Sequence, residues 1–532
     1  MLQKIVVFLM VMLDGQRLKA LALSRPGIIV CPALLGLTAT FGFAPYFYWP
    51  ITFGTLVLLN IMLASEKSLK AVFFTTLIYF TALNTCTLFW LDFVMEGFGG
   101  MPFFASFGVV LIFSAFYLSL PYALFNVIAV RICKNRVVPL LLCFMPLGYA
   151  ICDFYVSYVL TGFPWMLLGY TCLQGPFSSF APLLGVRGVT LLFTICAGAV
   201  SLGALRRFLF LPLAAVIFVS GILLTGISYT TPLEKHDAAL IQGNIRQEIR
   251  FNKAEVNNII ATYWNLTRPQ LGRHQLIVWP EAAIPLLFET ARPLIDDLNT
   301  VAHDKGSQLI IGMQRHNPET MKIYNSLFKL GDKESSDVYP VYDKQHLVPF
   351  GEFVPFEKYL RPLGKIFNIP MSDFSSSQEN AQVFECGDLK LIPAICYESI
   401  FPELIASLDA EDSNAILMVS NDSWFGTTRG PLQHLAIARM RSMELQKPML
   451  RVTNNGYTVL IDDKGQIKAA LPQNEQGVLE FEYTPTKGLT PYSLVGNSGV
   501  FFIMLLLLLS GVYSLRHRRS SQEQAVEHLV RP

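Results

Sequence analysis

The first 230 residues are dominated by long apolar stretches that polar residues interrupt only briefly. A helix needs about 20 mainly apolar residues to cross the hydrocarbon core of a bilayer. Stretches of this kind recur seven times before residue 231, and an eighth lies near residue 500. The predicted spans are residues 27–44, 50–65, 70–91, 104–130, 137–160, 180–203, 208–230 and 495–515. The pattern therefore predicts a multi-pass α-helical membrane domain.

Between residues 231 and 495 the pattern changes to short apolar segments, most of which end in polar or glycine residues. The predicted strands cover residues 238–245, 276–279, 309–311, 323–330, 391–395, 416–419 and 450–453. Helical stretches are predicted near residues 286–304, 399–409 and 431–446. Continuous apolar strands alternating with helices are typical of a sheet buried on both faces. This region is therefore predicted to be a layered α/β or α+β domain.

The charge pattern orients the chain in a membrane. Charged residues make up 15% of the chain, against about 25% in soluble proteins, and the deficit lies in the predicted spans. The loops 45–49, 92–103 and 161–179 contain no Lys or Arg, whereas the loops on the other side are basic. Because cytoplasmic loops are enriched in Lys and Arg, the α/β domain is predicted to face outward and both termini to be cytoplasmic. The net charge of +2, with no basic stripe, gives no indication of a nucleic-acid partner.

Five regions follow from these patterns. They are an N-terminal cytoplasmic or interfacial segment (1–26), a membrane domain of about seven helices (27–230), an outward-facing α/β domain (231–495), a C-terminal transmembrane helix (496–515) and a cytoplasmic tail (516–532).

The nine cysteines fall mostly in the membrane part. Seven lie there and are interpreted as small apolar packing residues. Only Cys386 and Cys396 lie in the α/β domain, with no CxxC pair and no Cys/His cluster of zinc spacing. No metal site is predicted, and a disulfide between these two cysteines is not expected.

Three chemically interesting side chains follow apolar segments of the α/β domain, where chemistry collects in such sheets. They are Glu281, Lys344 and Cys396. Each has an ordinary interpretation when it is taken alone. The glutamate could be a cap, the lysine a solvated surface residue, and the cysteine a buried packing residue.

Taken together and in order, the surrounding motifs resemble a known family. Trp279-Pro280-Glu281, the stretch from Tyr342 to Glu352 that contains Lys344-Gln345-His346-Leu347-Val348-Pro349-Phe350-Gly351, and Ile395-Cys396-Tyr397-Glu398 are similar to the Glu–Lys–Cys motifs of the nitrilase superfamily. With spans before and after, the chain resembles bacterial apolipoprotein N-acyltransferases from about residue 27 to 515. Gly-Phe-Pro-Trp at 162–165, Gln242-Gly243-Asn244 and the segment from Asn421 to Phe425 add to the resemblance. At residue 251 the family often has Trp, where this chain has Phe251, which puts a binding detail in doubt.

The resemblance implies a fold, a triad and a reaction. The fold would be an αββα sandwich, with Cys396 as nucleophile, Glu281 as proton acceptor and Lys344 stabilising the oxyanion. Glu352, Tyr397 and Glu398 would support these three, although a structural ion pair is an alternative role for the two glutamates. The family needs no cofactor.

The implied reaction has two steps and two lipid substrates. A phospholipid donates an acyl chain to Cys396 as a thioester, and the N-terminal amine of a diacylglyceryl apolipoprotein then accepts it. Four aromatic residues are predicted to contact substrate: Trp165, Phe251, Phe353 and Trp424. The implied location is the bacterial inner membrane, with the catalytic domain on the periplasmic side and a monomeric chain.

Two alternatives stay open at this point. One is a membrane-bound amidase of the nitrilase type, which would use water as acceptor. The other is a lipid transporter or lipid-binding protein with an outer accessory domain. A transporter would be expected to carry intramembrane charges along its substrate path. Few are present, Asp153 being the clearest, and no internal repeat is found.

Overall fold

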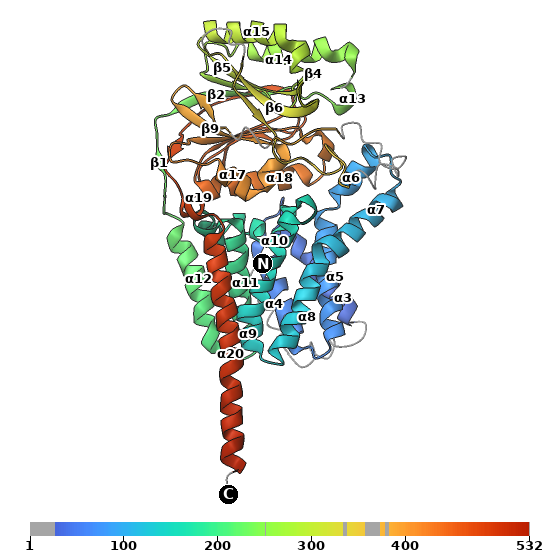
Figure 1. The fold of residues 1–532 in the computed structure, drawn as a ribbon, viewed down its shortest axis with the longest axis vertical. Coiled ribbons are helices and arrows are strands. Elements are labelled where there is room, and N and C mark those ends of the chain that lie inside the picture. Colours follow the sequence, from blue (N-terminus) through green and yellow to red (C-terminus); the bar gives the residue numbers. More distant parts are fainter. Residues whose placement is uncertain (1–26, 251, 333–337, 357–372, 378–381, 531–532) are drawn as a thin grey trace, which may run out of the picture.

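The computed structural model describes residues 27–250, 252–332, 338–356, 373–377 and 382–530. A bundle of helices forms one half, and a domain built on β-sheets is stacked on one end of it (Figure 1). The polypeptide enters the sheet domain after α12 (Leu211–Leu224) and leaves it through α19 (Pro491–Val495). The sheet domain is therefore tethered to the bundle at both of its ends.

The bundle is made of apolar helices joined by short turns. Its main helices are α3 (Gly27–Ala39), α4 (Trp49–Ser65), α5 (Leu69–Thr87), α6 (Trp90–Gly97), α7 (Phe103–Ile112), α8 (Leu120–Cys133), α9 (Val137–Pro139), α10 (Met145–Tyr158), α11 (Ala181–Ala204), α12 and α20 (Ser498–Val530). π-Helical turns η2 (Phe113–Ser119) and η3 (Leu140–Phe144) join α7 to α8 and α9 to α10. Short 3₁₀ turns are η1 (Thr40–Gly42), η4 (Val159–Thr161), η5 (Pro164–Met166), η6 (Leu168–Leu173), η7 (Pro176–Phe180) and η8 (Phe208–Phe210).

Each of the eight predicted span ranges contains an apolar helix. Within the described residues, five stretches are long and apolar enough to cross a membrane: Leu69–Thr87, Phe103–Cys133, Val137–Thr161, Pro176–Ala204 and Ser498–His517. The helices Ile29–Gly42, Trp49–Ser65 and Phe208–Leu224 are shorter. That these three also cross a bilayer stays a prediction.

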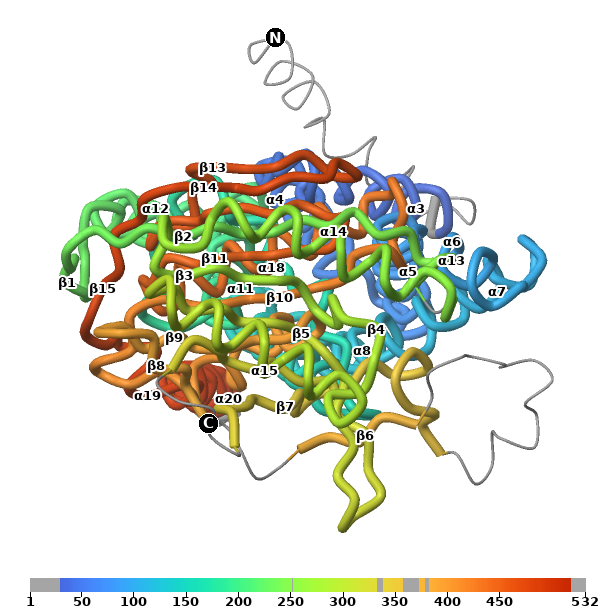
Figure 2. The backbone as a smooth tube through the Cα atoms, turned by 90° about the horizontal axis from the view of Figure 1, so that it is seen from above, coloured from blue at the N-terminus to red at the C-terminus, as the bar shows by residue number. Residues whose placement is uncertain are grey.

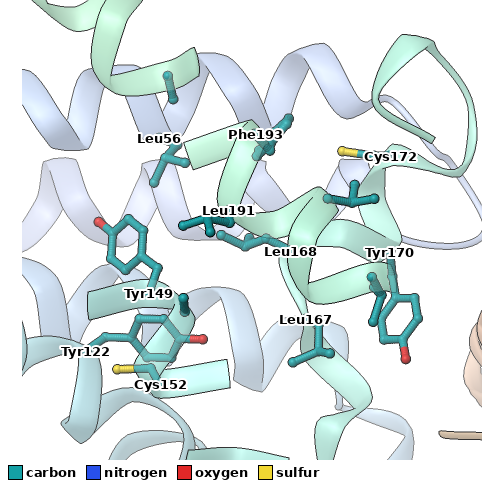
Figure 3. Close-up of a cluster of buried hydrophobic side chains, with 14 of the residues drawn as sticks. Leu56, Tyr122, Tyr149, Cys152, Leu167, Leu168, Tyr170, Cys172, Leu191 and Phe193 are labelled. Atoms are coloured by element: carbon teal, nitrogen blue, oxygen red, sulfur yellow. The ribbon is translucent and has the colours of Figure 1, made fainter. Parts of the chain in front are cut away.

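Packing separates central helices from peripheral ones. The Pro176–Ala204 stretch is 78% buried inside the protein, whereas the Ser498–His517 stretch is 11% buried. A helix that is apolar all round yet unburied has lipid as its natural surroundings. Figure 3 shows part of the central core, where Tyr122, Tyr149, Leu191 and Phe193 pack with Cys152 among other apolar side chains.

Two large sheets form the second half, and β1 and β15 make a separate two-stranded antiparallel sheet. One has the strand order β13-β12-β11-β10-β9-β8 and the other β14-β2-β3-β5-β6-β7, with β4 paired to β5. Central neighbours are parallel (β9 with β10, β10 with β11, β2 with β3, β3 with β5), and the outer pairs are antiparallel. The strands are β1 (Thr231–Pro232), β2 (His236–Gln242), β3 (Leu276–Val278), β4 (Ile284–Leu287), β5 (Gln308–Asn317), β6 (Lys322–Leu330), β7 (Val341–Asp343), β8 (Phe384–Cys386), β9 (Leu389–Ile395), β10 (Ala415–Ser420), β11 (Met449–Thr453), β12 (Thr458–Ile461), β13 (Ile467–Leu471), β14 (Gly477–Tyr483) and β15 (Thr486–Lys487).

The two sheets pack face to face between helical layers. One core contains residues of both sheets, and another joins the second sheet to α14 (Val256–Thr267) and α15 (Phe288–Asp304). Figure 2 shows α14 and α15 running over the strands, seen from above. On the other side lie α17 (Pro402–Ser407) and α18 (Gly430–Leu445), next to the bundle (Figure 1). The predicted fold class, a membrane helix domain plus an αββα nitrilase-like domain, is confirmed.

Two local predictions differ from the structure. The helix predicted over 399–409 is two pieces, η11 (Cys396–Ile400) and α17, because Phe401 is extended. Pro402 explains the break, since the residue before a proline is driven out of the helical region. Strand β5 also runs beyond Gly312 to Asn317, where it continues to pair with β6.

Candidate active site

The three residues of the predicted triad each lie just after a strand. Glu281 lies three residues beyond β3, Lys344 follows β7 and Cys396 follows β9. The Nζ atom of Lys344 lies 3.3 Å from Oε1 of Glu281. Both charges act on the Cys396 thiol, whose side chain is half-buried. The structure thus brings the three residues to one place, although they come from both sheets.

Lys344 is held between two carboxylates. Its Nζ atom donates to Oε1 of Glu352 at 2.9 Å as well as to Glu281. The amide of Asn325 donates to the same two oxygens, at 2.7 Å to Glu281 and 3.1 Å to Glu352. All four residues are buried. Burial alone would lower the pKa of Lys344, but the two carboxylates outweigh it and raise that pKa above its ordinary value. The lysine therefore stays a fixed cation.

The sequence interpretation missed Asn325. It lies inside the apolar strand β6, whose residues from Tyr324 onward are buried. A buried amide needs hydrogen-bond partners, so an Asn within an apolar strand was the signal that could have singled it out.

Hydrogen bonds to both the side chain and the backbone of Glu281 fix its orientation. Its Oε2 atom accepts a hydrogen bond of 2.8 Å from the backbone amide of Asn421, at the end of β10. The Arg250 guanidinium donates to the carbonyl oxygens of Glu281 and Ala282 at 3.1 and 2.6 Å. Arg250 is a further buried residue that the sequence did not single out.

Cys396, the predicted nucleophile, lies at a sharp turn from strand to helix. Cys396 has φ +53°, a left-handed conformation that a non-glycine residue adopts only when its surroundings hold it there. Burial, followed by the negative charge of Glu281, raises the pKa of its thiol well above the ordinary value, while Lys344 opposes them. The resting side chain is therefore a thiol, and forming the thiolate requires a base.

Glu398 joins the two strand ends that carry Lys344 and Cys396. Its carboxylate accepts from the backbone amides of Ile395 at 2.7 Å and Gln345 at 2.6 Å. The Tyr342 hydroxyl donates to it at 3.0 Å. Burial raises the pKa of Glu398 to about 7 in spite of these donors. The structure gives it a positioning contact rather than a contact with the triad side chains.

Two residues beside the triad reach the bundle. The Tyr397 hydroxyl donates to the Gly162 carbonyl at 2.9 Å, and Nε2 of His346 lies 3.0 Å from the Thr161 carbonyl. Burial lowers the pKa of His346 to about 4, so the neutral ring donates its Nε2 proton there. The site therefore rests on the loop 161–179.

The four predicted substrate-binding aromatics lie in different places. Trp165 is buried, and its indole N–H donates to Gln433 at 2.8 Å. Trp424 is half-buried, with its ring 4.7 Å from that of Phe98 on the loop 92–103. Phe353 is half-buried and its carbonyl accepts from the Phe350 amide. Phe251 lies outside the described residues. Substrate contact by any of them stays a prediction.

Comparisons with known proteins agree with this architecture. Residues 237–485 match the family described as Carbon-nitrogen hydrolase, and residues 35–199 match the Apolipoprotein N-acyltransferase N-terminal domain. The apolipoprotein N-acyltransferase of Vibrio cholerae is 36% identical over 505 residues, covering 94% of this chain and 98% of that protein. That of Vibrio parahaemolyticus is 36% identical and covers 92% and 96%. Among solved structures, Saccharomyces cerevisiae Nit3 has a TM-score of 0.36 and 19% identity, covering 48% of this chain and 92% of that one.

Proposed function

The chain belongs to the apolipoprotein N-acyltransferase family, and on this premise we propose that Cys396 carries an acyl chain from a phospholipid to the N-terminal amine of a diacylglyceryl apolipoprotein. The observation that carries the proposal is the buried cluster of Glu281, Lys344 and Glu352 beside a thiol that needs a base. The chemistry needs no cofactor.

In the first step Glu281 takes the proton of the Cys396 thiol, and the thiolate attacks an ester carbonyl of the phospholipid. The negative charge on the carbonyl oxygen of the tetrahedral intermediate is stabilised by Lys344 and by the backbone N–H of Tyr397. The C–O bond then breaks, and the lysophospholipid leaves as an alcohol that takes the proton from Glu281. The product on the enzyme is a Cys396 thioester.

In the second step the α-amine of the apolipoprotein attacks the thioester carbonyl. Glu281 takes a proton from the amine and returns it to the sulfur as the C–S bond breaks. The amide leaves, and Cys396 is a thiol again. The same two oxyanion donors serve both steps.

A lipid donor and a lipid-anchored acceptor fit the surroundings of the site. A cavity of about 1160 Å³ lies between α5, α6, α7 and the sheet domain. Its lining is mostly apolar, including Phe93, Phe107 and Phe116, and Arg429 of the sheet domain also borders it. Trp90, which lines the same cavity, packs against Trp165 and Phe425. Acyl chains held there would keep their reacting ends close to the sheet domain.

The location follows from the charge pattern and the substrates. We expect a monomer in the bacterial inner membrane, with the sheet domain on the periplasmic side, where the loops 45–49, 92–103 and 161–179 carry no Lys or Arg. A test is to introduce single cysteines into loops on each side, such as the Cys-free loop 92–103, and to label them with a membrane-impermeant reagent.

The reaction is tested by mass spectrometry of purified protein mixed with phospholipid but no acceptor. An acyl adduct on Cys396, absent in Cys396→Ala and discharged by a diacylglyceryl peptide, is the expected result. A membrane-bound amidase would instead pass the acyl group to water. Full N-acylation of the peptide by Cys396→Ala would refute the proposal.

A further inference from the structure

The backbone carbonyl of the nucleophile is held by a histidine that the reaction outlined above does not use. His434 lies on α18, and its Nε2 atom is 3.2 Å from the Cys396 carbonyl oxygen and 3.0 Å from the Ser399 hydroxyl. The Ser399 hydroxyl donates to the same carbonyl at 3.0 Å. The side chain of His434 is only 1% exposed. A buried imidazole and a hydroxyl therefore converge on one oxygen of the catalytic turn.

The other face of the imidazole meets a buried ion pair. Its Nδ1 atom is 3.2 Å from Oδ1 of Asp422 and 3.2 Å from a guanidinium nitrogen of Arg451. Asp422 and Arg451 are themselves paired at 2.8 Å, and neither is exposed. Burial alone would raise the pKa of Asp422, but Arg451 and His434 lower it well below its ordinary value. Asp422 therefore stays ionised beside the imidazole.

A hydrogen bond from the imidazole to the Cys396 carbonyl places a proton on Nε2. A carbonyl oxygen only accepts hydrogen bonds, so the contact with Cys396 requires a proton on Nε2. The neutral ring meets this requirement if Nδ1 accepts from Arg451, and the cationic ring meets it with Nδ1 donating to Asp422. In either state the Nε2 proton lies between the Cys396 carbonyl and the Ser399 hydroxyl, which itself donates to that carbonyl.

A hydrogen bond that holds the Cys396 carbonyl also fixes the direction of the Tyr397 N–H. The C=O of Cys396 and the N–H of Tyr397 belong to one planar trans peptide unit, in which they point in opposite directions. The Tyr397 amide is also in the first turn of η11, where helix amides have no intrahelical acceptor. A donor on one side of the peptide thus directs the N–H on the other side, where the oxyanion would form.

The histidine is in turn positioned by the membrane half. The Trp165 ring stacks on the imidazole, with centroids 5.6 Å apart at 25°. Gln433, the preceding residue of α18, accepts from the indoles of Trp165 and Trp90 and donates to the Thr87 carbonyl at 2.9 Å. Contacts with the bundle therefore fix the position of the His434 imidazole on α18.

We propose that His434 is a positioning residue that sets the Cys396–Tyr397 peptide for oxyanion stabilisation and is itself seated by Trp165 and Gln433 of the interface with the membrane helices. The inference rests on the proposed function, because it assigns His434 to the acylation of Cys396. His434 touches no reacting atom. It acts through the backbone of the nucleophile.

The test measures single-turnover acylation of Cys396, followed by lysophospholipid release and by protein mass, in full-length protein in detergent. His434→Phe keeps a ring against Trp165 but removes the Nε2 proton. We expect about 10- to 100-fold slower acylation at saturating phospholipid, with an unchanged half-saturating phospholipid concentration and a protein that stays folded at the assay temperature, because a lost oxyanion donor itself costs about 10²–10³-fold. His434→Gln, which keeps an N–H donor, should recover most of the rate. His303→Phe, on a partly exposed surface of α15, is the matched control.

Ser399→Ala provides a milder probe of the same carbonyl. It removes one hydroxyl and should slow acylation about threefold or more. Wild-type acylation in His434→Phe would overturn the inference. A second result would also overturn it. This is a His434→Phe variant that loses activity because it unfolds at the assay temperature, together with a Ser399→Ala variant that acylates at the wild-type rate. Absence of any adduct in the wild-type protein would instead refute the proposed function itself.

Discussion

Replacing Lys344 with Met tests the electrostatic core of the site most directly. Lys344 is the only cation among the three charged side chains of the cluster with Glu281 and Glu352, which together carry a net charge of −1. The Lys344→Met variant changes that charge to −2 while it keeps a side chain of similar length. Two buried carboxylates then face each other across the Asn325 amide alone.

The expected magnitudes follow from the distances. At an effective dielectric constant of about 20, each contact of roughly 3 Å supplies about 5 kcal/mol of attraction before desolvation is counted. Removing one partner of such a buried ion pair costs about 3–5 kcal/mol of stability. Loss of the oxyanion donor should slow acylation of Cys396 by about 10²–10³-fold.

A double variant separates stability from catalysis. Lys344→Met/Glu352→Gln returns the cluster to a net charge of −1 and leaves Glu281 in place. We expect it to recover a large part of the lost thermal stability but none of the lost acylation rate. Thermal unfolding in detergent and single-turnover acylation measure the two effects.

Two results would refute this reasoning. Acylation by Lys344→Met within tenfold of the wild-type rate would remove Lys344 from oxyanion stabilisation. A double variant no more stable than Lys344→Met would show that charge balance does not govern the cluster.

Four further predictions concern single residues. Burial raises the pKa of Glu398 from 4.5 to about 7, so the folded protein keeps a proton that the unfolded chain releases. The stability that this proton supplies is complete below pH 4.5 and is lost as the pH rises through 7. Between these pH values the wild-type free energy of unfolding should fall by about 3 kcal/mol more than that of Glu398→Gln, measured by chemical unfolding. Asn325→Leu should cost about 1–3 kcal/mol and slow acylation, since both carboxylates lose a donor. Tyr397→Phe should lower stability by about 1 kcal/mol through the lost contact with the Gly162 carbonyl, seen in thermal unfolding. Burial raises the pKa of Cys386 to about 12, so it should resist alkylation near pH 8, and Cys386→Ser should keep full acyl transfer.

Local patterns were sufficient for much of the architecture. Apolar length locates the helices, and apolar runs locate most strands, because both depend on which face of a short segment must avoid water. The same patterns place Glu281 and Cys396 beyond strand ends. Local propensity was not sufficient near Phe401, where the following proline divides a predicted helix. The sequence interpretation also contained no helix at α14.

What the sequence by itself determined is therefore the division into a membrane half and an α/β half, and the candidate residues Glu281, Lys344 and Cys396. Only the tertiary structure decided how they meet, because the contacts join strands of two sheets whose pairing no local pattern encodes. It also revealed Asn325 between the two carboxylates and His434 beside the Cys396 carbonyl. Alone in the sequence, an Asn in a strand and a His on a helix are unremarkable. Their roles come from buried polar groups that must find partners across the fold.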